Sequence, residues 1–289
     1  MTSCDPFHAY VAGFEQLLAQ GRLLGAGQAR AAALPAVPDG APVCLVFSPH
    51  PDDEAIAGGL PLRLRREGPW RVVNVAVTLG SNRARRRARW DELRQCCDLL
   101  GFDLVSASGE SEHGLERIDP MSAQADAVHW ARCVERVAAL LRLHRPQLVV
   151  CPHAQDGHPA HVGTHALVMD ALPVAGLQHR LHLACSEYWN TQLHPGLMVE
   201  LGCREVADLV AALSQHVGEV ARNPYHVGLP AWFIDGVRRG AERVGAAGAA
   251  APDFRFAALY GWQRWEQGAL VAMPPRAVPL TTPAQTLFA

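Results

Sequence analysis

The stretch that most constrains this chain is a short apolar run that ends in a cluster of ionisable residues. Residues 43–47 (VCLVF) are rich in β-formers and short enough for one buried strand. Residues 48–54 (SPHPDDE) follow directly, and an apolar, helix-like segment comes next. A histidine and three acids therefore sit where a strand ends and a helix begins. In open α/β sheets that edge is where ligands bind.

The residue types in this turn suit a metal ion. His50 offers an imidazole nitrogen and Asp53 a carboxylate oxygen, and both are ordinary zinc donors. Asp52 and Asp53 are adjacent, so their side chains diverge, and one can ligate while the other transfers a proton. The alternative is that both aspartates only cap the next helix and interact with its dipole. From this turn alone, the two interpretations stay open.

A second cluster favours the metal. Residues 147–152 (QLVVCP) form another short apolar run, and residues 153–165 (HAQDGHPAHVGTH) follow it before a further helix. A catalytic zinc needs three protein ligands and one open position. His50, Asp53 and one histidine of the second cluster meet that count. An alternative pair is His161 with His165, because residues four apart share a helix face. Ligand type alone also admits Fe(II), Co(II) or Ni(II) in place of Zn²⁺.

The two clusters resemble the motifs of a known family. His50-Pro51-Asp52-Asp53-Glu54 and the later His158-Pro159-Ala160-His161, about one hundred residues on, resemble those of the LmbE-like/PIG-L family of zinc-dependent N-acyl-amino-sugar deacetylases. The resemblance covers roughly residues 43–172. It implies that His50, Asp53 and His161 bind zinc. It also implies that Asp52 is the general base and His158 the general acid and oxyanion stabiliser.

The resemblance has one departure and suggests further roles. The family usually has Asp where this chain has Ala160, and that Asp is thought to tune the neighbouring histidine. A catalytically impaired relative that binds metal and sugar is therefore the alternative function. Three residues are expected to contact substrate: Arg89, from the family's pattern of Arg three before Glu; Asp156, which alternatively orients His158; and Asn82, in a loop after the second strand.

The pattern along the chain predicts an α/β fold. Residues 43–47, 71–78, 103–106, 147–152 and 181–189 are predicted strands, and helices are predicted at 83–101 and 123–144 between them. Such βαβ units give parallel strands. The expected architecture is a Rossmann-like, mostly parallel sheet flanked by helices on both faces. G-x-G-x-x-G is absent after the first strand, which argues against a dinucleotide-binding protein.

The regions outside the motifs complete one expected LmbE-like deacetylase domain over residues 1–289. Residues 5–33 are predicted to form a leading helix that packs on the flank of the domain, and residues 1–40 are the helical extension and linker. The catalytic motifs lie in 43–172 and a substrate-side part in 173–272, with helices at 204–220 and 230–244 and a late strand at 254–262. The tail, 273–289, shows no periodicity.

Composition narrows the function classes. A net charge of −2 gives no global attraction to nucleic acid, although five arginines cluster at 83–89. No apolar run approaches the ~20 residues needed to span a bilayer, and no signal peptide is recognised, so a cytoplasmic protein is expected. The eight cysteines form no C-x-x-C pair, so a reduced compartment and no thiolate metal site are expected. Homo-oligomerisation is left open.

The predicted activity is zinc-dependent removal of an N-acetyl group from a small amino sugar, such as an N-acetylglucosaminide.

Overall fold

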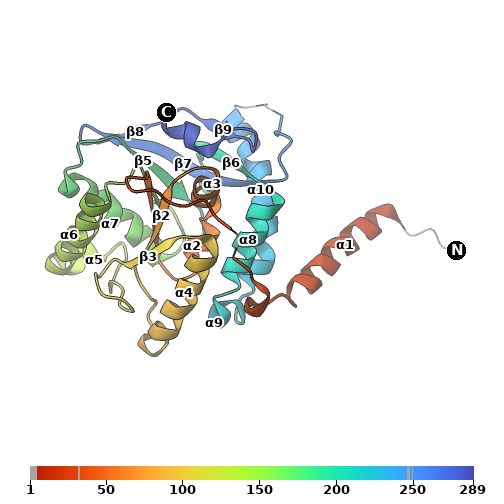
Figure 1. The fold of residues 1–289 in the computed structure, drawn as a ribbon, viewed down its shortest axis with the longest axis horizontal. Helices are drawn as coiled ribbons and strands as arrows, with labels where there is room; N and C mark the ends of the chain where they lie inside the picture. The colour runs from red at the N-terminus through yellow and green to blue at the C-terminus, as the bar shows by residue number, and fades with distance from the viewer. Residues whose placement is uncertain (1–4, 32, 246–247, 249) are drawn as a thin grey trace.

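A computed structural model describes residues 5–31, 33–245, 248 and 250–289. Across this part of the chain, nine strands form a single sheet in the order β3-β2-β1-β4-β5-β7-β6-β9, with β8 paired to β7 (Figure 1). The first five strands are parallel: β1 (Val43–Ser48), β2 (Arg71–Ala76), β3 (Asp103–Ser106), β4 (Leu148–Pro152) and β5 (Leu181–Ser186). The predicted mostly parallel α/β sheet is confirmed.

The second half of the sheet departs from the parallel pattern. β7 (Phe256–Glu266) runs antiparallel to both β5 and β6 (Leu197–Leu201), while β9 (Arg276–Val278) adds parallel to β6. The short β8 (Ala269–Ala272) forms a hairpin with the end of β7. The sequence predicted the late strand but neither β6 nor the strands in and near the tail, because their apolar runs are short.

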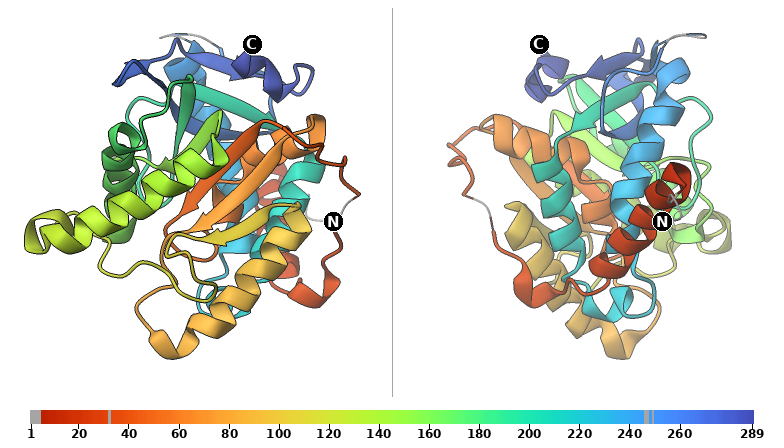
Figure 2. Two further views of the ribbon diagram at one scale, coloured as in Figure 1. Left: turned by 60° about the vertical axis from the view of Figure 1, so that its left-hand side comes forward. Right: turned by 90° about the vertical axis from the view of Figure 1, so that its right-hand side faces the viewer.

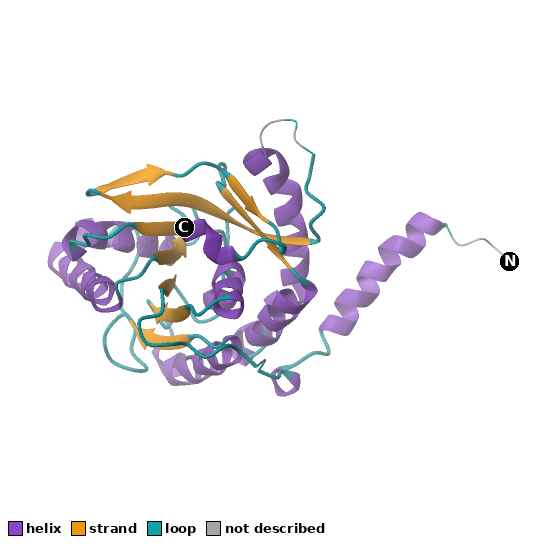
Figure 3. Ribbon diagram, turned by 45° about the horizontal axis from the view of Figure 1, so that its top comes forward, coloured by secondary structure: helices purple, strands orange, loops and turns teal. Residues whose placement is uncertain are grey.

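Helices cover both faces of the sheet (Figures 2 and 3). One face carries α2 (Asp53–Ile56), α3 (Gly59–Glu67), α4 (Arg86–Leu100), α8 (Cys203–Leu213) and α10 (Tyr225–Gly245). The other carries α6 (Ala127–His144), preceded by the short α5 (Ser122–Ala125), and α7 (Pro159–Ala175). Alternate residues of β1 enter the two cores: Cys44 and Val46 face the first, and Leu45 and Phe47 the second. Burial on both faces explains the unbroken apolar run.

The leading helix differs most from expectation. α1 (Pro6–Gly21) is followed only by the short η1 (Ala26–Gln28), so the predicted helix over 5–33 stops early. None of the residues of α1, all of which are described, is buried, and Phe7 is 79% exposed. The helix projects from the body (Figure 1) and meets it near Gly21, beside Val227 of α10. The prediction that it packs on the flank of the domain is wrong, because its apolar stripe contacts no surface in the described chain.

Two other helices also differ from the sequence pattern. The segment 204–220 was predicted to be one helix, but the structure divides it into two. α8 ends at Leu213, and the short α9 (Val217–Val220) follows. His216 lies in the break, where it is fully buried. α10 begins at Tyr225, so Pro230 lies inside the helix rather than in its first turn. Proline has no N–H to donate, so one hydrogen bond of α10 is missing there.

The sheet order places the turn after β1 beside the turn after β4. From β1 the chain proceeds outward through β2 and β3, then returns to place β4 on the other side of β1. Strand order therefore reverses between β1 and β4, which is the position where open α/β sheets bind ligands. Within the described residues, no helix is both long and apolar enough to cross a membrane.

Candidate metal centre

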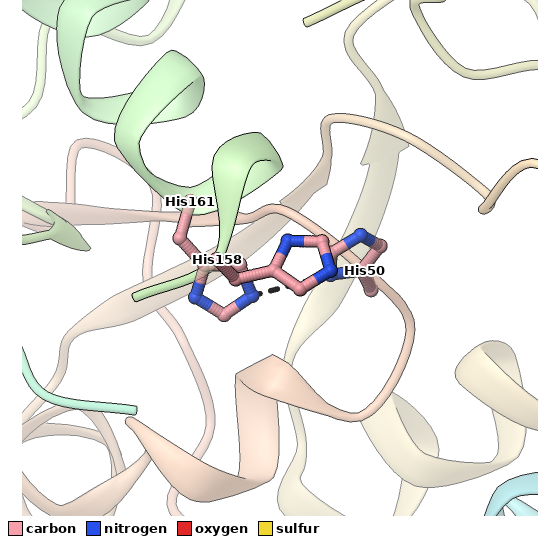
Figure 4. Close-up of side chains that lie close together, drawn as sticks. All are labelled: His50, His158 and His161. Atoms are coloured by element: carbon pink, nitrogen blue, oxygen red, sulfur yellow. Dashed lines mark hydrogen bonds between the residues drawn. The ribbon is translucent and has the colours of Figure 1, made fainter. Parts of the chain in front are cut away.

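Three side-chain donors from the two turns converge at this switch point. His50 Nδ1 lies 3.2 Å from His161 Nε2, although the two residues are 111 positions apart. Asp53 Oδ2 lies 3.5 Å from His50 Nδ1 and 3.3 Å from His161 Nε2. Figure 4 shows the rings of His50 and His161 approaching each other, with His158 beside them. The sequence predicted these three ligands, and the fold brings them together.

The spacing of these atoms fits one metal ion. Donors bound tetrahedrally at about 2.0–2.2 Å lie about 3.3–3.6 Å from one another. Two of the observed separations, 3.3 and 3.5 Å, fall in that range, and the third, 3.2 Å, is 0.1 Å below it. His158 is also near, with its ring centroid 4.7 Å from that of His50 and 5.1 Å from that of His161. One ligand atom of each of the three histidines lies within 4.8 Å of the others, so His158 is close enough to contact a group bound at the donors.

The turn after β1 holds Asp52 in an unusual backbone conformation. Asp52 has φ 115° and ψ −27°, a region that non-glycine residues rarely adopt. Its N–H donates to Glu54 Oε2 at 3.0 Å, and the N–H of His50 donates to Asp53 Oδ2 at 2.8 Å. The acids of the motif therefore brace the turn themselves. This geometry lets adjacent aspartates point apart, one toward the donors and one toward the cavity.

The environment of Asp52 suits a group that accepts a proton. Its side chain is buried, and it lines the cavity next to the three donors. Burial, followed by the charges of Asp53 and Glu54, raises the pKa of Asp52 well above its ordinary value, while Arg89 acts in the opposite direction. A carboxylate with a raised pKa is a stronger base than a solvated one.

Asp156 lies behind His161. Its Oδ1 is 3.4 Å from His161 Nδ1, on the side of the ring away from Asp53, and it also accepts the N–H of His158 at 3.1 Å. Its Oδ2 accepts the N–H of Trp189 at 3.0 Å, and the side chain is buried. Asp156 was expected to touch substrate, but its carboxylate faces His161 and does not line the cavity. A carboxylate on the second nitrogen of a ligating histidine orients that ring.

His158 is the N-cap of α7. Its Nδ1 accepts the N–H of Ala160 at 3.2 Å, so a neutral ring carries its proton on Nε2. Burial, followed by the charges of His50 and His161, lowers the pKa of His158 below its ordinary value. The partial positive charge at the start of the helix acts in the same direction. Ala160 lines the cavity beside it and supplies no carboxylate to offset these effects.

The three donor residues line a cavity of about 1190 Å³ that has an arginine-rich wall. Buried Glu219 of α9 pairs with Arg85 at 3.1 Å, with Arg89 at 3.7 Å and with Arg222. Opposite, Glu116 pairs with two more arginines of the cluster near α4. Each of these five arginines is thus paired with a carboxylate, although the side chains of Arg83 and Arg222 stay mostly exposed.

The predicted substrate residues Arg89 and Asn82 both line this cavity. Arg89 also donates to the backbone oxygens of Leu79 and Pro51, and Asn82 caps the short η2 (Arg83–Arg85). Sequence reasoning missed the part of the lining that comes from α9, α10 and their connection: Glu219, Arg222, Tyr225, Leu229 and Trp232. No motif marks these positions, because tertiary packing brings them to the site: α10 packs on α8, and Glu219 pairs with Arg85 and Arg89.

Two histidines of the second cluster lie outside the centre. His153 is buried, and its Nε2 lies 2.9 Å from the carbonyl oxygen of Asn190. His165 Nδ1 lies 2.8 Å from the carbonyl oxygen of Pro152. The alternative zinc pair of His161 with His165 does not form, because His161 turns toward His50 and Asp53.

Comparison with known proteins identifies a family match over the motif region. Residues 45–172 match the family described as PIG-L: GlcNAc-PI de-N-acetylase. The chain is 30% identical over 171 residues to the 1D-myo-inositol 2-acetamido-2-deoxy-alpha-D-glucopyranoside deacetylase of Mycobacterium leprae. That alignment covers 51% of this chain and 55% of the relative, so the chain spans about half the length of the curated relatives it matches.

Solved structures share the fold at low sequence identity. The N,N'-diacetylchitobiose deacetylase of Pyrococcus horikoshii superposes with a TM-score of 0.54 at 16% identity, covering 91% of this chain and 94% of that one. The 4-carboxy-2-hydroxymuconate hydratase of Pseudomonas putida KT2440 superposes with a TM-score of 0.53 at 17% identity, covering 82% and 98%. Proteins named for different reactions therefore share this fold, so the function has to be inferred from the residues of the site.

Proposed function

We propose that this chain, in which residues 45–172 form a PIG-L (LmbE-like) family domain, is a metal-dependent hydrolase that removes an N-acetyl group from an amino sugar or glycoconjugate. The observation that carries the proposal is the set of three donors, His50 Nδ1, Asp53 Oδ2 and His161 Nε2, which lie 3.2–3.5 Å apart beside buried Asp52. The curated relative is named as a deacetylase of an acetamido sugar, which supports the same reaction.

Zn²⁺ is the ion that these donors fit best. Two imidazoles and one carboxylate are an ordinary catalytic zinc set, and they leave one position open. When bound, the ion polarises the amide carbonyl and lowers the pKa of water. Asp156 behind His161 supports the assignment, because ligating histidines usually carry such a partner on their second nitrogen.

The protein's own residues supply the proton transfers. Asp52 takes the proton of the attacking water as the oxygen bonds to the acetamide carbon. Neutral His158 donates its Nε2–H to the developing oxyanion, which suits the lowered pKa of this ring. As the C–N bond breaks, Asp52 returns its proton to the nitrogen, so Asp52 takes the general-acid role that the resemblance implies for His158, and His158 keeps the role of oxyanion stabiliser. The products are acetate and a free amine, so no further reactant is required.

The cavity favours a substrate larger than one sugar. Its volume of about 1190 Å³ exceeds the ~300–1,000 Å³ of common small-molecule sites. Arg85, Arg89 and Arg222 share the single carboxylate of Glu219, which leaves excess positive charge on that wall. Guanidinium groups bind polyols, carboxylates and phosphates. A conjugate whose second group is polyhydroxylated or anionic would therefore be held there.

The alternative is a metal-binding relative that has lost turnover, suggested by Ala160. The structure favours an active enzyme, because Asp52 and His158 both line the cavity beside the donors. Acetate release should be measured for a panel of N-acetylglucosaminides, before and after chelation and after adding Zn²⁺ back. We expect release that chelation abolishes and Zn²⁺ restores. A metal-loaded protein that releases no acetate from any member would defeat the proposal.

A further inference from the structure

We propose that Cys151, His165 and Cys185 form a second metal site, separate from the centre at His50. One ligand atom from each of these three residues lies within 4.8 Å of the others. Cys151 and Cys185 are directly paired residues of the neighbouring parallel strands β4 and β5, so their side chains project on the same face of the sheet. Helix α7 places His165 over that face.

His165 is oriented as a metal ligand would be. Its Nδ1 lies 2.8 Å from the carbonyl oxygen of Pro152, so a neutral ring donates its Nδ1–H to that oxygen. This leaves the lone pair on Nε2 for an ion. A backbone carbonyl on one nitrogen, with the other free, is the usual arrangement of ligating histidines, because it fixes both tautomer and ring orientation.

Charge balance selects the kind of ion. Both cysteines are buried, with 0% and 5% of their surface exposed, in an apolar core that includes Leu167 and Leu183. A buried site with net charge would carry a large desolvation cost. A divalent ion with two thiolates and one neutral imidazole has zero net charge, and it forms with release of two thiol protons. Soft thiolates favour Zn²⁺ or Co²⁺ over hard ions such as Mg²⁺.

The fourth coordination position would lie on the side of His165. His165 keeps some solvent exposure, whereas both cysteines are buried. Two cysteines, one histidine and a water form a known zinc coordination set. An ion here would tie the second turn of α7 to β4 and β5. His161 lies one helical turn away on α7, so the second ion would also fix the helix that carries a ligand of the first.

Co²⁺ binding to the metal-free full-length protein tests this site without relying on activity. Thiolate-bound Co²⁺ gives an intense near-ultraviolet charge-transfer absorption, and the centre at His50 contains no thiolate. We expect this absorption in the unmodified protein and two bound Co²⁺ per chain. In Cys151→Ala and Cys185→Ala the absorption should disappear, and bound Co²⁺ should fall to one.

Two control variants separate this site from the proposed active centre. Cys44→Ala removes a thiol that is equally buried, on β1 and facing the opposite core, so its absorption should match the unmodified protein. His50→Ala should lose one Co²⁺ and keep the absorption. The proposal is overturned if the unmodified protein binds Co²⁺ without charge transfer. It is also overturned if the absorption survives in both Cys151→Ala and Cys185→Ala, or if these two thiols are isolated as a disulfide under reducing conditions.

Discussion

His216 Nε2 lies 2.6 Å from Glu54 Oε1, and neither side chain is exposed to solvent. The other oxygen of Glu54 accepts the N–H of Asp52. A histidine 162 positions away, in the break between α8 and α9, thus holds the acid that fixes the turn of the proposed base. The break interrupts a predicted helix because His216 must leave the helical path to reach Glu54.

Replacing His216 with leucine should destabilise the protein strongly. The substitution leaves the Glu54 carboxylate buried without its partner, which typically costs about 3–5 kcal/mol. His216→Gln retains a donor and should cost less. The free energy of unfolding from denaturant titration measures both changes. If His216→Leu is as stable as the unmodified chain, the contact does not have the structural role assigned to it.

Asp52→Asn should lower kcat by about 10²–10⁴-fold, the usual contribution of a general base. Asparagine keeps the shape of the side chain but cannot accept the proton. Bound zinc, measured by elemental analysis, should remain at the level of the unmodified protein. His161→Ala serves as the contrast and should lose the zinc itself. Deacetylation by Asp52→Asn at the full rate would show that another group acts as base.

Asp156→Asn should weaken zinc binding by about 10–100-fold, because it removes the carboxylate behind His161. Competition with a chromophoric chelator measures the dissociation constant. Asp170→Asn, on the same helix, is the matched control, because Asp170 accepts a hydrogen bond from Trp130 and lies away from the metal centre. Equal zinc affinity in both variants would place Asp156 outside the ligand-supporting network.

The stability of the fold should decline below neutral pH through partly buried histidines such as His182. The His182 ring stacks on Trp262, with centroids 5.2 Å apart, and burial lowers its pKa. The unfolded chain therefore binds a proton at a higher pH than the folded chain does. Stability should be full above the ordinary pKa of about 6.5 and should fall as pH drops through it. His182→Phe keeps the stacking and should give a shallower decline in unfolding free energy between pH 7.5 and 5.5, whereas an unchanged slope would exclude His182 as a contributor.

The sequence predicted the residues that follow β1 and β4, because strand ends and ligand types are local signals. These signals predicted His50, Asp53 and one histidine of the second cluster as ligands, and the family resemblance singled out His161. The lining from α9 and α10 was not predicted, since Glu219 and Arg222 reach the cavity only through the tertiary packing that places Glu219 beside Arg85. His216 carried no signal either, because a lone histidine in an amphipathic segment has no distinguishing pattern.

The cysteines show the same limit in another form. Cys151 and Cys185 are far apart in sequence, and a search for C-x-x-C spacing does not relate them. They become neighbours through the register of β4 with β5. Similarly, α1 shows clear helical periodicity, but periodicity does not reveal whether another surface covers its apolar stripe. Local pattern determines which element forms, whereas tertiary arrangement determines what each element contacts.

The left-handed backbone conformation of Asp52 lowers the stability of the fold at a residue that is proposed to take part in the reaction. A non-glycine residue in such a conformation costs on the order of 1–3 kcal/mol. Glycine at position 52 would adopt this conformation without strain. We therefore expect the Asp52→Gly variant to unfold at a higher temperature than the unmodified protein. An aspartate at a position that glycine would hold at lower cost is the pattern expected where a side chain serves a reaction rather than folding.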